Sequence, residues 1–569
     1  MKSNLTIGIA GTGGDGVVAL GSFLQKIAAH QGYLSQMPRF YSAQIRGGGS
    51  AVKLGLNSKS LSLPQDTIDI MLCFDWEKYL EVSQILQITR DTVVLYEKPP
   101  PSAIDLPASA YCIAFSERSL LSTGTAHNKN LVALGLLLKI LGLSEVRTRQ
   151  VIEEDPELHL IKKKRASLEA GAEILSELSI PDLRLSPAKD DSAKIIIHGS
   201  AAMGKAMIHA GCRAFFGYPI TPAAEIMQAM QKELPGVSGV FVQAEDEIAA
   251  LGMVVGASLT GEKAVTATSG PGLDLMTETM GLAIAAEIPM VIINVQRCGP
   301  STGIPSKSEQ SDLNHAIYGG HGDAPRVVMA PYDVEGCYRL IHESIDIAEH
   351  FQTLVVLLSD QWLGQTFVAI DGTALERADQ PSSRKRPVAH DLKGYHRYRL
   401  TDDSISPISD VGDEGLMYRT SGLTHTAEGM PAFDSKTHQG LHEKRWKKLL
   451  PLCQRDDLVK IFGNETSRQG IITWGSSAQV VLDTVDFLGL QDSLKVCVPE
   501  LICPLPENID RFMQSVDTLL VIEMNYSGQL YRYLRSQIDL PKETRVYCRA
   551  GGQPFSQREL AGPIREMPK

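Results

Sequence analysis

Short apolar runs that alternate with turn residues and helical spacing recur along this chain of 569 residues, and they constrain its fold more than any other feature. Residues 5–10, 291–295 and 518–523 are examples, each ending in a polar or glycine-bearing turn that precedes a helix-like segment. Runs of this length are typical of buried strands. Their spacing predicts βαβ units, whose strands pair in parallel. We therefore expect an α/β fold made of several parallel-sheet domains.

The chain is too long for one hydrophobic core, so several domains are expected. The stretch SIPDLRLSPAKDDSA, which is polar and bears prolines, predicts a linker. A later stretch is polar with little periodicity, which predicts an irregular arm. These signals divide the chain into a first α/β domain (1–180), a linker (181–193), a second α/β domain (194–380), a connecting arm (381–450) and a final α/β domain (451–569).

Charge and hydropathy exclude two classes of protein. The net charge of -11 argues against nucleic-acid binding, which needs a clustered basic surface. The best apolar run, 280–295, is broken by Glu287 and Pro289 and falls short of the ~18 residues of a membrane span. The N-terminus lacks the pattern of a signal peptide. We expect a cytoplasmic protein that binds neither nucleic acid nor membranes.

The 9 cysteines are scattered singly along the chain. The closest pair is Cys497 and Cys503, and no C-x-x-C motif occurs. The spacing therefore predicts no iron-sulfur or zinc site in this chain. A reaction that needs a cluster would take it from another subunit.

The loop GTGGDG at 11–16 follows a strand and opens a helix, as the dinucleotide motif G-x-G-x-x-G does. No acidic residue occurs from 17 to 65, so the partner of a ribose hydroxyl is missing and NAD binding is disfavoured. We expect instead either a face for an anion such as the phosphates of coenzyme A, or a tight turn beside an interdomain surface. The basic residues of this stretch are Lys26, Arg39, Arg46, Lys53 and Lys59, with glycines at 47–49.

The same loop begins like the magnesium and diphosphate motif of thiamine enzymes. That motif needs an asparagine 25 to 30 residues on, whereas the next asparagine after Asp15 is Asn57. This sequence therefore has no intact diphosphate motif.

Four segments between residues 217 and 312 place polar groups directly after an apolar run. In the first, GYPITP, Thr221 and Pro222 predict a helix start with threonine as N-cap and proline at the first position. In the second, EDE at 245–247 opens the apolar run 248–259. Acids in a first helical turn are usually solvated. Glu247 adjoins the apolar run, however, where it can share a proton with a bound heterocycle.

The third segment, TATSGPG at 266–272, is a loop of small residues. It permits close approach of a flat ligand, although plain turn chemistry would look the same. The fourth, QRCGPSTGIPS, places Arg297 at a strand end beside hydroxyls and glycines. A guanidinium there suits bidentate binding of a carboxylate, with a structural salt bridge as the alternative.

As an ordered set, YPITP, QAEDEIAALG, TATSGPG and QRCGPSTGIPS resemble the α subunit of the 2-oxoacid:ferredoxin oxidoreductases. The segment VIEMNYSGQL extends the resemblance toward the C-terminus, and GTGGDGV and IRGGGS are similar to the γ domain of that family, here fused in front of α. The arrangement is most similar to the 2-oxoglutarate-specific branch.

The resemblance implies a γ-type accessory domain, a thiamine-diphosphate pyrimidine-binding domain and a transketolase C-terminal-like domain. It implies a β subunit that holds the diphosphate, Mg²⁺ and a [4Fe-4S] cluster, with ferredoxin as electron acceptor and a dimer of αβ heterodimers. The implied reaction is the coenzyme-A-dependent oxidative decarboxylation of 2-oxoglutarate to succinyl-CoA and CO2, which is reversible as a CO2-fixing reductive carboxylation.

The resemblance also assigns site residues. Glu247 would hydrogen-bond N1′ of the aminopyrimidine, Arg297 would pair with the C1 carboxylate of the substrate, and Thr221 and Ser306 would bind the 2-oxo group. Ser306 departs from the threonine usual in the family. Glu247, Arg297 and Thr221 would be catalytic. Further cofactor contacts would come from Tyr218, Pro219, Ile220, Ser269 and Gly270.

Other functions remain open at this point. The same chemistry on pyruvate or a branched 2-oxoacid is one, and a non-redox thiamine enzyme is another. A third is a non-catalytic protein that binds an acyl-CoA.

Overall fold

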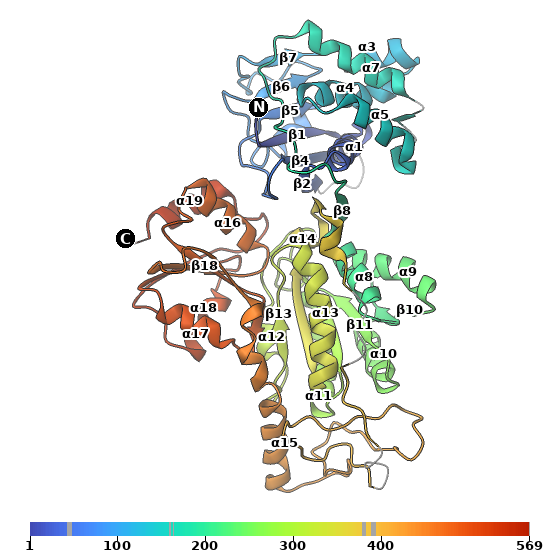
Figure 1. The fold of residues 1–569 in the computed structure, drawn as a ribbon, viewed down its shortest axis with the longest axis vertical. Coiled ribbons are helices and arrows are strands. Elements are labelled where there is room, and N and C mark those ends of the chain that lie inside the picture. Colours follow the sequence, from blue (N-terminus) through green and yellow to red (C-terminus); the bar gives the residue numbers. More distant parts are fainter. Residues whose placement is uncertain (42–47, 159–160, 163, 378–382, 389–393, 568–569) are drawn as a thin grey trace. The chain divides into compact units, whose positions relative to one another are not determined.

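A computed structural model describes residues 1–41, 48–158, 161–162, 164–377, 383–388 and 394–567 (Figure 1). The chain forms two compact units. The first comprises Met1–His198 and Gln365–Ala374, and the second comprises Gly199–Gly364 and Leu375–Lys569. The predicted domain boundaries at residues 180, 194, 380 and 450 stay predictions.

The first unit is built on one sheet with the strand order β7-β6-β5-β1-β4-β2-β15-β8, and β3 pairs beside β4. The strands are β1 (Asn4–Thr12), β2 (Leu34–Met37), β3 (Arg39–Tyr41), β4 (Gly49–Asn57), β5 (Ile70–Cys73), β6 (Val93–Tyr96), β7 (Ala110–Cys112), β8 (Ile195–His198) and β15 (Phe367–Ile370).

This first sheet is mixed, whereas the sequence predicted parallel strands. β1, β5, β6 and β7 are parallel, but β4 pairs antiparallel with β1, β2 and β3. The connection 42–48 between β3 and β4 is too short for the crossover that a parallel pair requires. The strand expected at 5–10 is present as β1.

Helices of the first unit are α1 (Val17–His30), α2 (Trp76–Leu80), α3 (Phe115–Thr123), α4 (Lys129–Ile140), α5 (Glu145–Glu154) and α7 (Arg165–Ile174). The apolar side chains of α4 are buried in the core of this unit. Glycines let α4 and α7 approach closely. A Cβ on Gly135 would lie 2.0 Å from the carbonyl oxygen of Leu168, and one on Gly171 would lie 1.9 Å from that of Val132.

The second unit contains a sheet with the order β10-β9-β11-β12-β14-β13-β19. All neighbours are parallel except β13 and β19, which confirms the parallel sheet predicted here. The strands are β9 (Ala214–Gly217), β10 (Val240–Gln243), β11 (Ala264–Thr268), β12 (Met290–Gln296), β13 (Val327–Met329), β14 (Leu354–Asp360) and β19 (Leu501–Cys503).

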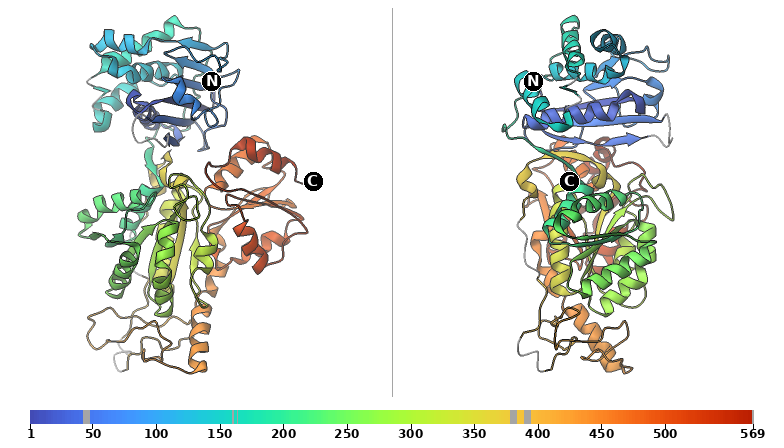
Figure 2. Two further views of the ribbon diagram at one scale, coloured as in Figure 1. Left: turned by 180° about the vertical axis from the view of Figure 1, so that it is seen from behind. Right: turned by 90° about the vertical axis from the view of Figure 1, so that its right-hand side faces the viewer.

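Helices cover this sheet, as Figure 2 shows. α10 and α11 pack on β9, β11 and β12, and α13 packs on β12 and β14. Every residue of β12 and β14 is buried, as in strands with both faces covered. The helices are α8 (Gly199–His209), α9 (Ala224–Glu233), α10 (Glu247–Leu259), α11 (Gly270–Ala285), α12 (Leu313–Tyr318), α13 (Val334–Phe351) and α14 (Gln361–Gln365).

A third sheet with the order β16-β18-β17-β20-β21 completes the second unit. We call residues 459–567, which carry it, the C-terminal module. Its strands are β16 (Val459–Gly463), β17 (Gln469–Thr473), β18 (Lys495–Pro499), β20 (Thr518–Glu523) and β21 (Glu543–Cys548). Its helices are α16 (Ser477–Phe487), α17 (Glu507–Gln514), α18 (Gln529–Gln537) and α19 (Gln557–Arg565).

The segment 381–450, predicted to be irregular, contains the helix α15 (Ser435–Lys447), which lies near the end of α11 in Figure 1. Its buried side carries charge rather than an apolar stripe, so apolar periodicity could not reveal it. Lys444 donates to Glu287, and Lys448 donates to the same carboxylate at 2.9 Å. All three side chains are almost fully buried.

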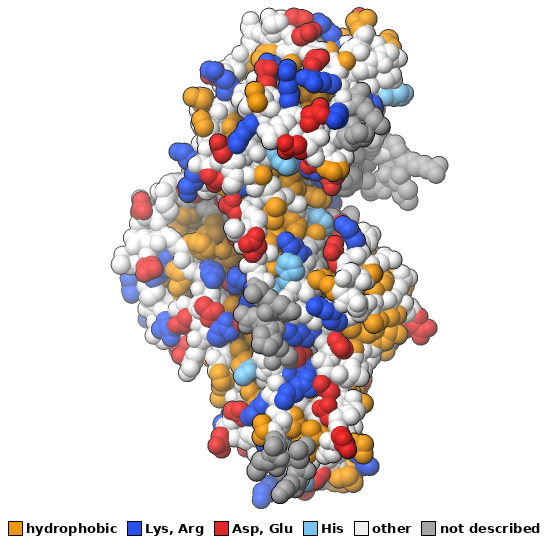
Figure 3. Space-filling view, turned by 45° about the vertical axis from the view of Figure 1, so that its right-hand side comes forward, with side chains coloured by type: hydrophobic (Ala, Val, Ile, Leu, Met, Phe, Trp, Pro, Cys, Tyr) orange, Lys and Arg blue, Asp and Glu red, His pale blue; other side chains and the backbone are white. Residues whose placement is uncertain are grey.

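Three further features of the structure concern membrane-spanning helices, surface charge and cysteines. No helix in the described part of the chain is long and apolar enough to cross a membrane. Acidic and basic side chains are interspersed over the face drawn in Figure 3. All 9 cysteines are free thiols.

Candidate functional site

The carboxyl ends of the parallel strands in the second unit bring the four predicted segments to one edge. The segments follow β9, β10, β11 and β12, which are neighbours in the sheet. Ligands of such sheets bind at this edge, because loops and helix N-termini converge there. The structure therefore groups the predicted site residues as the sequence suggested.

The loop after β9 differs from its prediction. Helix α9 begins at Ala224 with Ala223 as N-cap, so Thr221 is not the N-cap and Pro222 is not the first helical residue. The Thr221–Pro222 peptide bond is cis, and residues 221–223 form a turn. The prediction of a standard helix start was wrong because the turn at 221–223 separates Thr221 and Pro222 from the first residue of the helix. Thr221 is exposed at the sheet edge.

Glu247 opens α10 beneath an N-cap made by its neighbour. The side chain of Asp246 accepts a hydrogen bond from the backbone N–H of Ala249 at 2.7 Å. Glu247 is 5% exposed and accepts no hydrogen bond from the described residues. A Cβ on Gly272 would lie 2.7 Å from Glu247 Oε1 and 2.1 Å from Thr268 Oγ1. Glycine at 272 thus lets the start of α11 lie directly against this buried carboxylate, where a side chain would not fit.

Arg297 follows β12 and reaches across β11 to the loop after β9. Its Nη1 donates to the carbonyl oxygen of Thr221 at 2.6 Å. The side chain is 7% exposed, and its Nε is buried without a hydrogen-bond partner among the described residues. The charge of Asp312 acts on this guanidinium. Burial lowers the pKa of this guanidinium. A cation in this state is available to an anionic ligand.

The loop after Arg297 closes on itself. The N–H of Cys298 donates to the carbonyl oxygen of Lys307 at 3.0 Å, and that of Ile304 donates to Cys298 at 3.2 Å. Gly303 has φ 51°, and a Cβ there would lie 1.7 Å from the carbonyl oxygen of Cys298. Ser306 lies at the base of this loop and is exposed.

The predicted cofactor contacts fall on two loops. Tyr218, Pro219 and Ile220 follow β9, and Tyr218 is 37% exposed. Ser269 and Gly270 follow β11. Ser269 Oγ is buried and has no hydrogen-bond partner among the described residues.

Sequence reasoning missed Asn294 and Asp312, which interact at this edge. Asn294 in β12 donates from Nδ2 to Asp312 at 2.8 Å, and Ser311 Oγ donates to the same carboxyl group at 2.6 Å. Burial raises the pKa of Asp312 despite these two bonds. A Cβ on Gly270 would lie 3.1 Å from it. Asn294 was detectable as the one polar residue in the apolar run 291–295.

The acidic side chain of the N-terminal glycine loop is bonded within the first unit. Asp15 accepts from the N–H of Thr12 at 2.7 Å and pairs with Lys129 at 2.7 Å. Burial lowers the pKa of Lys53 to about 8, and Lys26 pairs with Asp155. The predicted basic face therefore loses Lys53 to the interior. Arg46 lies outside the described residues.

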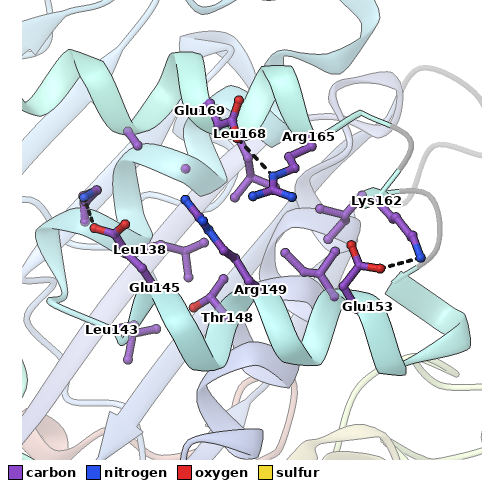
Figure 4. Close-up of a pocket in the computed structure, with 15 residues that line it drawn as sticks. Leu138, Leu143, Glu145, Thr148, Arg149, Glu153, Lys162, Arg165, Leu168 and Glu169 are labelled. Atoms are coloured by element: carbon purple, nitrogen blue, oxygen red, sulfur yellow. Dashed lines mark hydrogen bonds and ion pairs between the residues drawn. The ribbon is translucent and has the colours of Figure 1, made fainter.

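The first unit also holds a cavity of about 110 Å³ between α4, α5 and α7 (Figure 4). Its apolar lining includes Leu138, Leu143 and Leu168. Ion pairs join its rim, as between Arg165 and Glu169. These pairs make the rim self-complementary in charge. The other rim pairs are Lys139–Glu145 and Lys162–Glu153.

The edge site of the second unit has a definite chemical capacity. It presents a buried carboxylate, a buried guanidinium and an orphaned hydroxyl around glycine-bearing loops. Glu247 can hold a proton on a heterocyclic nitrogen, and Arg297 can hold a carboxylate. No group of three or more metal-ligating side chains lies among the described residues.

Two family models match the sequence. The one described as "Pyruvate flavodoxin/ferredoxin oxidoreductase, thiamine diP-bdg" matches residues 205–444. The one described as "Pyruvate ferredoxin/flavodoxin oxidoreductase" matches residues 6–174. The first contains all the predicted site residues.

Curated proteins and a solved structure are also similar. The chain is 29% identical to a 2-oxoacid:ferredoxin oxidoreductase subunit alpha from Sulfolobus sp, over 97% of this chain and 95% of that protein. It is 36% identical to a 2-oxoglutarate synthase subunit KorA from Archaeoglobus fulgidus, over 59% of this chain and 89% of that protein. It matches the structure of 2-oxoglutarate:ferredoxin oxidoreductase from Magnetococcus marinus with 2-oxoglutarate, coenzyme A and succinyl-CoA bound, at TM-score 0.92 and 33% identity over 100% of both chains.

Proposed function

Because this chain belongs to the 2-oxoacid:ferredoxin oxidoreductases as an alpha subunit, we propose that its enzyme acts on 2-oxoglutarate. The 2-oxoacid and coenzyme A give succinyl-CoA, CO2, one proton and two electrons, and ferredoxin takes the electrons one at a time. Run backwards, the same steps carboxylate succinyl-CoA reductively.

The observation that carries the proposal is the state of Arg297. This guanidinium is buried and has an unpartnered Nε among the described residues. Burying a cation is costly unless an anion compensates it. Asp312 is a described carboxyl whose charge acts on Arg297, but burial raises the pKa of that carboxyl, so an anionic ligand is a natural partner of the guanidinium. The specific substrate is supported by the relatives named 2-oxoglutarate synthase subunits and by the full-length similarity to an enzyme with 2-oxoglutarate bound.

The residues at this edge fit thiamine diphosphate. Glu247 is a buried carboxylate that accepts no hydrogen bond from the described residues, and Ser269 Oγ is buried without a hydrogen-bond partner among them. These features suit a planar heterocycle that offers hydrogen-bonding edges. When bound, this cofactor supplies the nucleophilic carbon and the electron sink for decarboxylation.

We assign the roles of this chain's residues as follows. Glu247 holds a proton against N1′ of the aminopyrimidine, and Arg297 grips the C1 carboxylate of the substrate. The hydroxyls of Thr221 and Ser306 bind the 2-oxo oxygen. Groups placed before charge develops stabilise the transition state without reorganising. The further residues that would contact the ring are Tyr218, Pro219 and Ile220 in the loop after β9, and Ser269 and Gly270 in the loop after β11.

The proposal assigns the diphosphate, Mg²⁺ and a [4Fe-4S] cluster to a partner β subunit. This sequence supports that assignment because it has no C-x-x-C motif and no asparagine at the distance that a diphosphate motif requires. The assembly is proposed to be a dimer of αβ heterodimers, with residues 1–180 as the γ-type domain, 194–380 as the pyrimidine-binding domain and 451–569 as the transketolase C-terminal-like domain.

The test is reduction of a low-potential viologen dye by this chain co-expressed with its β subunit. The assay compares 2-oxoglutarate with pyruvate and a branched 2-oxoacid, each with and without coenzyme A. Turnover with 2-oxoglutarate that requires coenzyme A supports the proposal. Turnover with pyruvate alone would keep the family and refute the substrate. Absence of turnover with every 2-oxoacid would favour a non-redox thiamine enzyme or an acyl-CoA-binding protein.

A further inference from the structure

The loop that carries Arg297 is joined to the C-terminal module through one fully buried amide. Gln310 Nε2 donates to the carbonyl oxygen of Trp474 at 2.6 Å. Its Oε1 accepts from the N–H of Met524 at 2.6 Å and from Ser477 Oγ at 3.0 Å. Its own backbone N–H donates to the carbonyl oxygen of Met524 at 2.8 Å. Gln310 thus bonds to two separate loops of the module, after β17 and after β20.

A second glutamine, Gln529, belongs to the C-terminal module and bonds to the segment after Arg297. Gln529 at the start of α18 donates from Nε2 to the carbonyl oxygen of Ser311 at 2.8 Å. Its Oε1 accepts from the N–H of Asn314 at 2.8 Å. The N–H of Gly552 adds a bond to the carbonyl oxygen of Ser308 at 3.0 Å. Residues 308–314 are therefore bonded to the module along their length.

The connection continues from this segment to Arg297. Ser311 Oγ donates to the carbonyl oxygen of Arg297 at 2.9 Å. The N–H of Asp312 donates to Gln296 Oε1 at 3.1 Å. Gln529, Ser311 and Arg297 are thus linked by successive hydrogen bonds, from the third sheet to the guanidinium-bearing residue of the second.

We propose that Gln310 and Gln529 are positioning residues for substrate binding, and that the C-terminal module holds the Arg297 loop in the geometry that receives the substrate's carboxylate. The inference rests on the proposed function, because it takes Arg297 as the carboxylate ligand. It gives the module a task in an active site to which the module contributes no predicted contact.

The chemistry of a buried amide explains the choice of glutamine. Gln310 satisfies an acceptor and two donors at once, which an apolar residue cannot do and a carboxylate can do only in part. Replacing it leaves the carbonyl oxygen of Trp474 and the N–H of Met524 unpaired in the interior, which is costly. A loop released by such a change moves its ligand-binding group, and a displacement of about 1 Å can cost ~10²-fold in rate.

The experiment compares Gln529→Met and Gln529→Glu in the complex of the full chain with its β subunit. Methionine removes both side-chain bonds, whereas glutamate keeps the acceptor for Asn314 and loses the donor to Ser311. Gln529 is half-buried, so these variants are expected to fold. Gln310→Met is the stronger change and is used if it folds. Ser467→Ala is the matched control, because Ser467 Oγ donates to Ser493 within the module at 2.7 Å and does not touch the loop.

Two readouts are measured. Without substrate, amide hydrogen exchange at residues 298–307 should speed up in Gln529→Met, less in Gln529→Glu, and not in Ser467→Ala. In turnover, KM for the 2-oxoacid should rise about tenfold or more in Gln529→Met, because two hydrogen bonds are lost and one ordinary bond is worth up to about tenfold, while kcat changes less. A purely structural role would lower thermal stability in variant and control alike and leave KM unchanged.

Unchanged exchange at 298–307 in Gln529→Met overturns the inference. Faster exchange with an unchanged KM overturns it as well, because the loop would then be held for no purpose in binding. Failure of this inference can be distinguished from failure of the proposed function. If another 2-oxoacid is the substrate, the KM shift is read with that acid. If wild type turns over no 2-oxoacid, the exchange rates alone decide whether the module holds the loop.

Discussion

Arg297 donates from Nη1 to the backbone carbonyl oxygen of Thr221, 2.6 Å away. The two residues follow β12 and β9, which are separated in the sheet by β11. The bond fixes the plane of the guanidinium and leaves Nε without a partner among the described residues. Two residues 76 positions apart in sequence thereby meet at the edge where we propose that the substrate's carboxylate binds.

Arg297→Lys should lower kcat/KM for the 2-oxoacid about 10²-fold. Lysine keeps the charge but cannot bond Thr221 and a carboxylate in one plane. Dye-reduction kinetics of the αβ complex measure the effect, and calorimetric titration should show unchanged affinity for thiamine diphosphate. The control is Arg468→Lys, whose arginine pairs with Asp517 on the surface. Equal losses in both variants would refute the role of Arg297.

Glu247→Gln should lower kcat by ~10²- to 10⁴-fold, as loss of a proton-transfer group does. Glutamine keeps the size and removes the carboxylate. Glu245→Gln, two residues earlier and exposed, is the control and should retain full activity. A Glu247→Gln enzyme within threefold of wild type would exclude this carboxylate from the chemistry.

Gly303→Ala should raise KM for the 2-oxoacid about tenfold or more, because a Cβ 1.7 Å from the carbonyl oxygen of Cys298 forces the loop open. Gly322→Ala is the matched control. It places a Cβ at φ 68° with nothing within 4 Å, so it carries the same backbone strain without the clash. The comparison is made by steady-state kinetics. Similar KM values in the two variants would show that loop closure does not matter for binding.

Glu287→Gln should destabilise the second unit by about 3–5 kcal/mol, the cost of breaking a buried ion pair. Burial raises the pKa of Glu287, but the charges of Lys444 and Lys448 outweigh it and hold that pKa below its usual value. The unfolded chain therefore takes up the proton first as the pH falls. The stabilisation is complete above pH 4.5, the ordinary value, and is lost below it.

Denaturant unfolding of wild type and Glu287→Gln from pH 7 to pH 3 measures this dependence. The gap between the two proteins should be constant down to about pH 5 and narrow below it. A gap independent of pH would mean that Glu287 does not act through its charge.

The sheets were predictable where local pattern determines them. The runs 5–10, 291–295 and 518–523 became β1, β12 and β20 because a buried strand needs a continuous apolar segment of that length. Helix α15 was missed because its buried face carries Lys444 and Arg445, which form no apolar stripe. The antiparallel pairing of β4 depends on which strands meet, and periodicity carries no information about that.

Some residues at the edge of the second sheet could be recognised from the sequence, and others could not. Glu247 and Arg297 were recognisable because each follows or opens an apolar run, where a parallel sheet delivers it to the ligand edge. Gln310 and Gln529 gave no such signal. Apart from Ser477 Oγ, the partners given above for their side chains are backbone atoms of segments more than 100 residues away, and backbone atoms are the same at every position of a sequence.

The sequence by itself determined the strands of the second unit and the edge to which they bring Glu247 and Arg297, the two charged residues of the proposed site, because these follow from local spacing. Only the tertiary structure decided that Arg297 bonds to Thr221, that Glu247 lies against Gly272, and that residues 308–314 are hydrogen-bonded to the C-terminal module. Those contacts depend on distances between remote segments, which are set when the whole chain packs and not by any run of neighbouring residues.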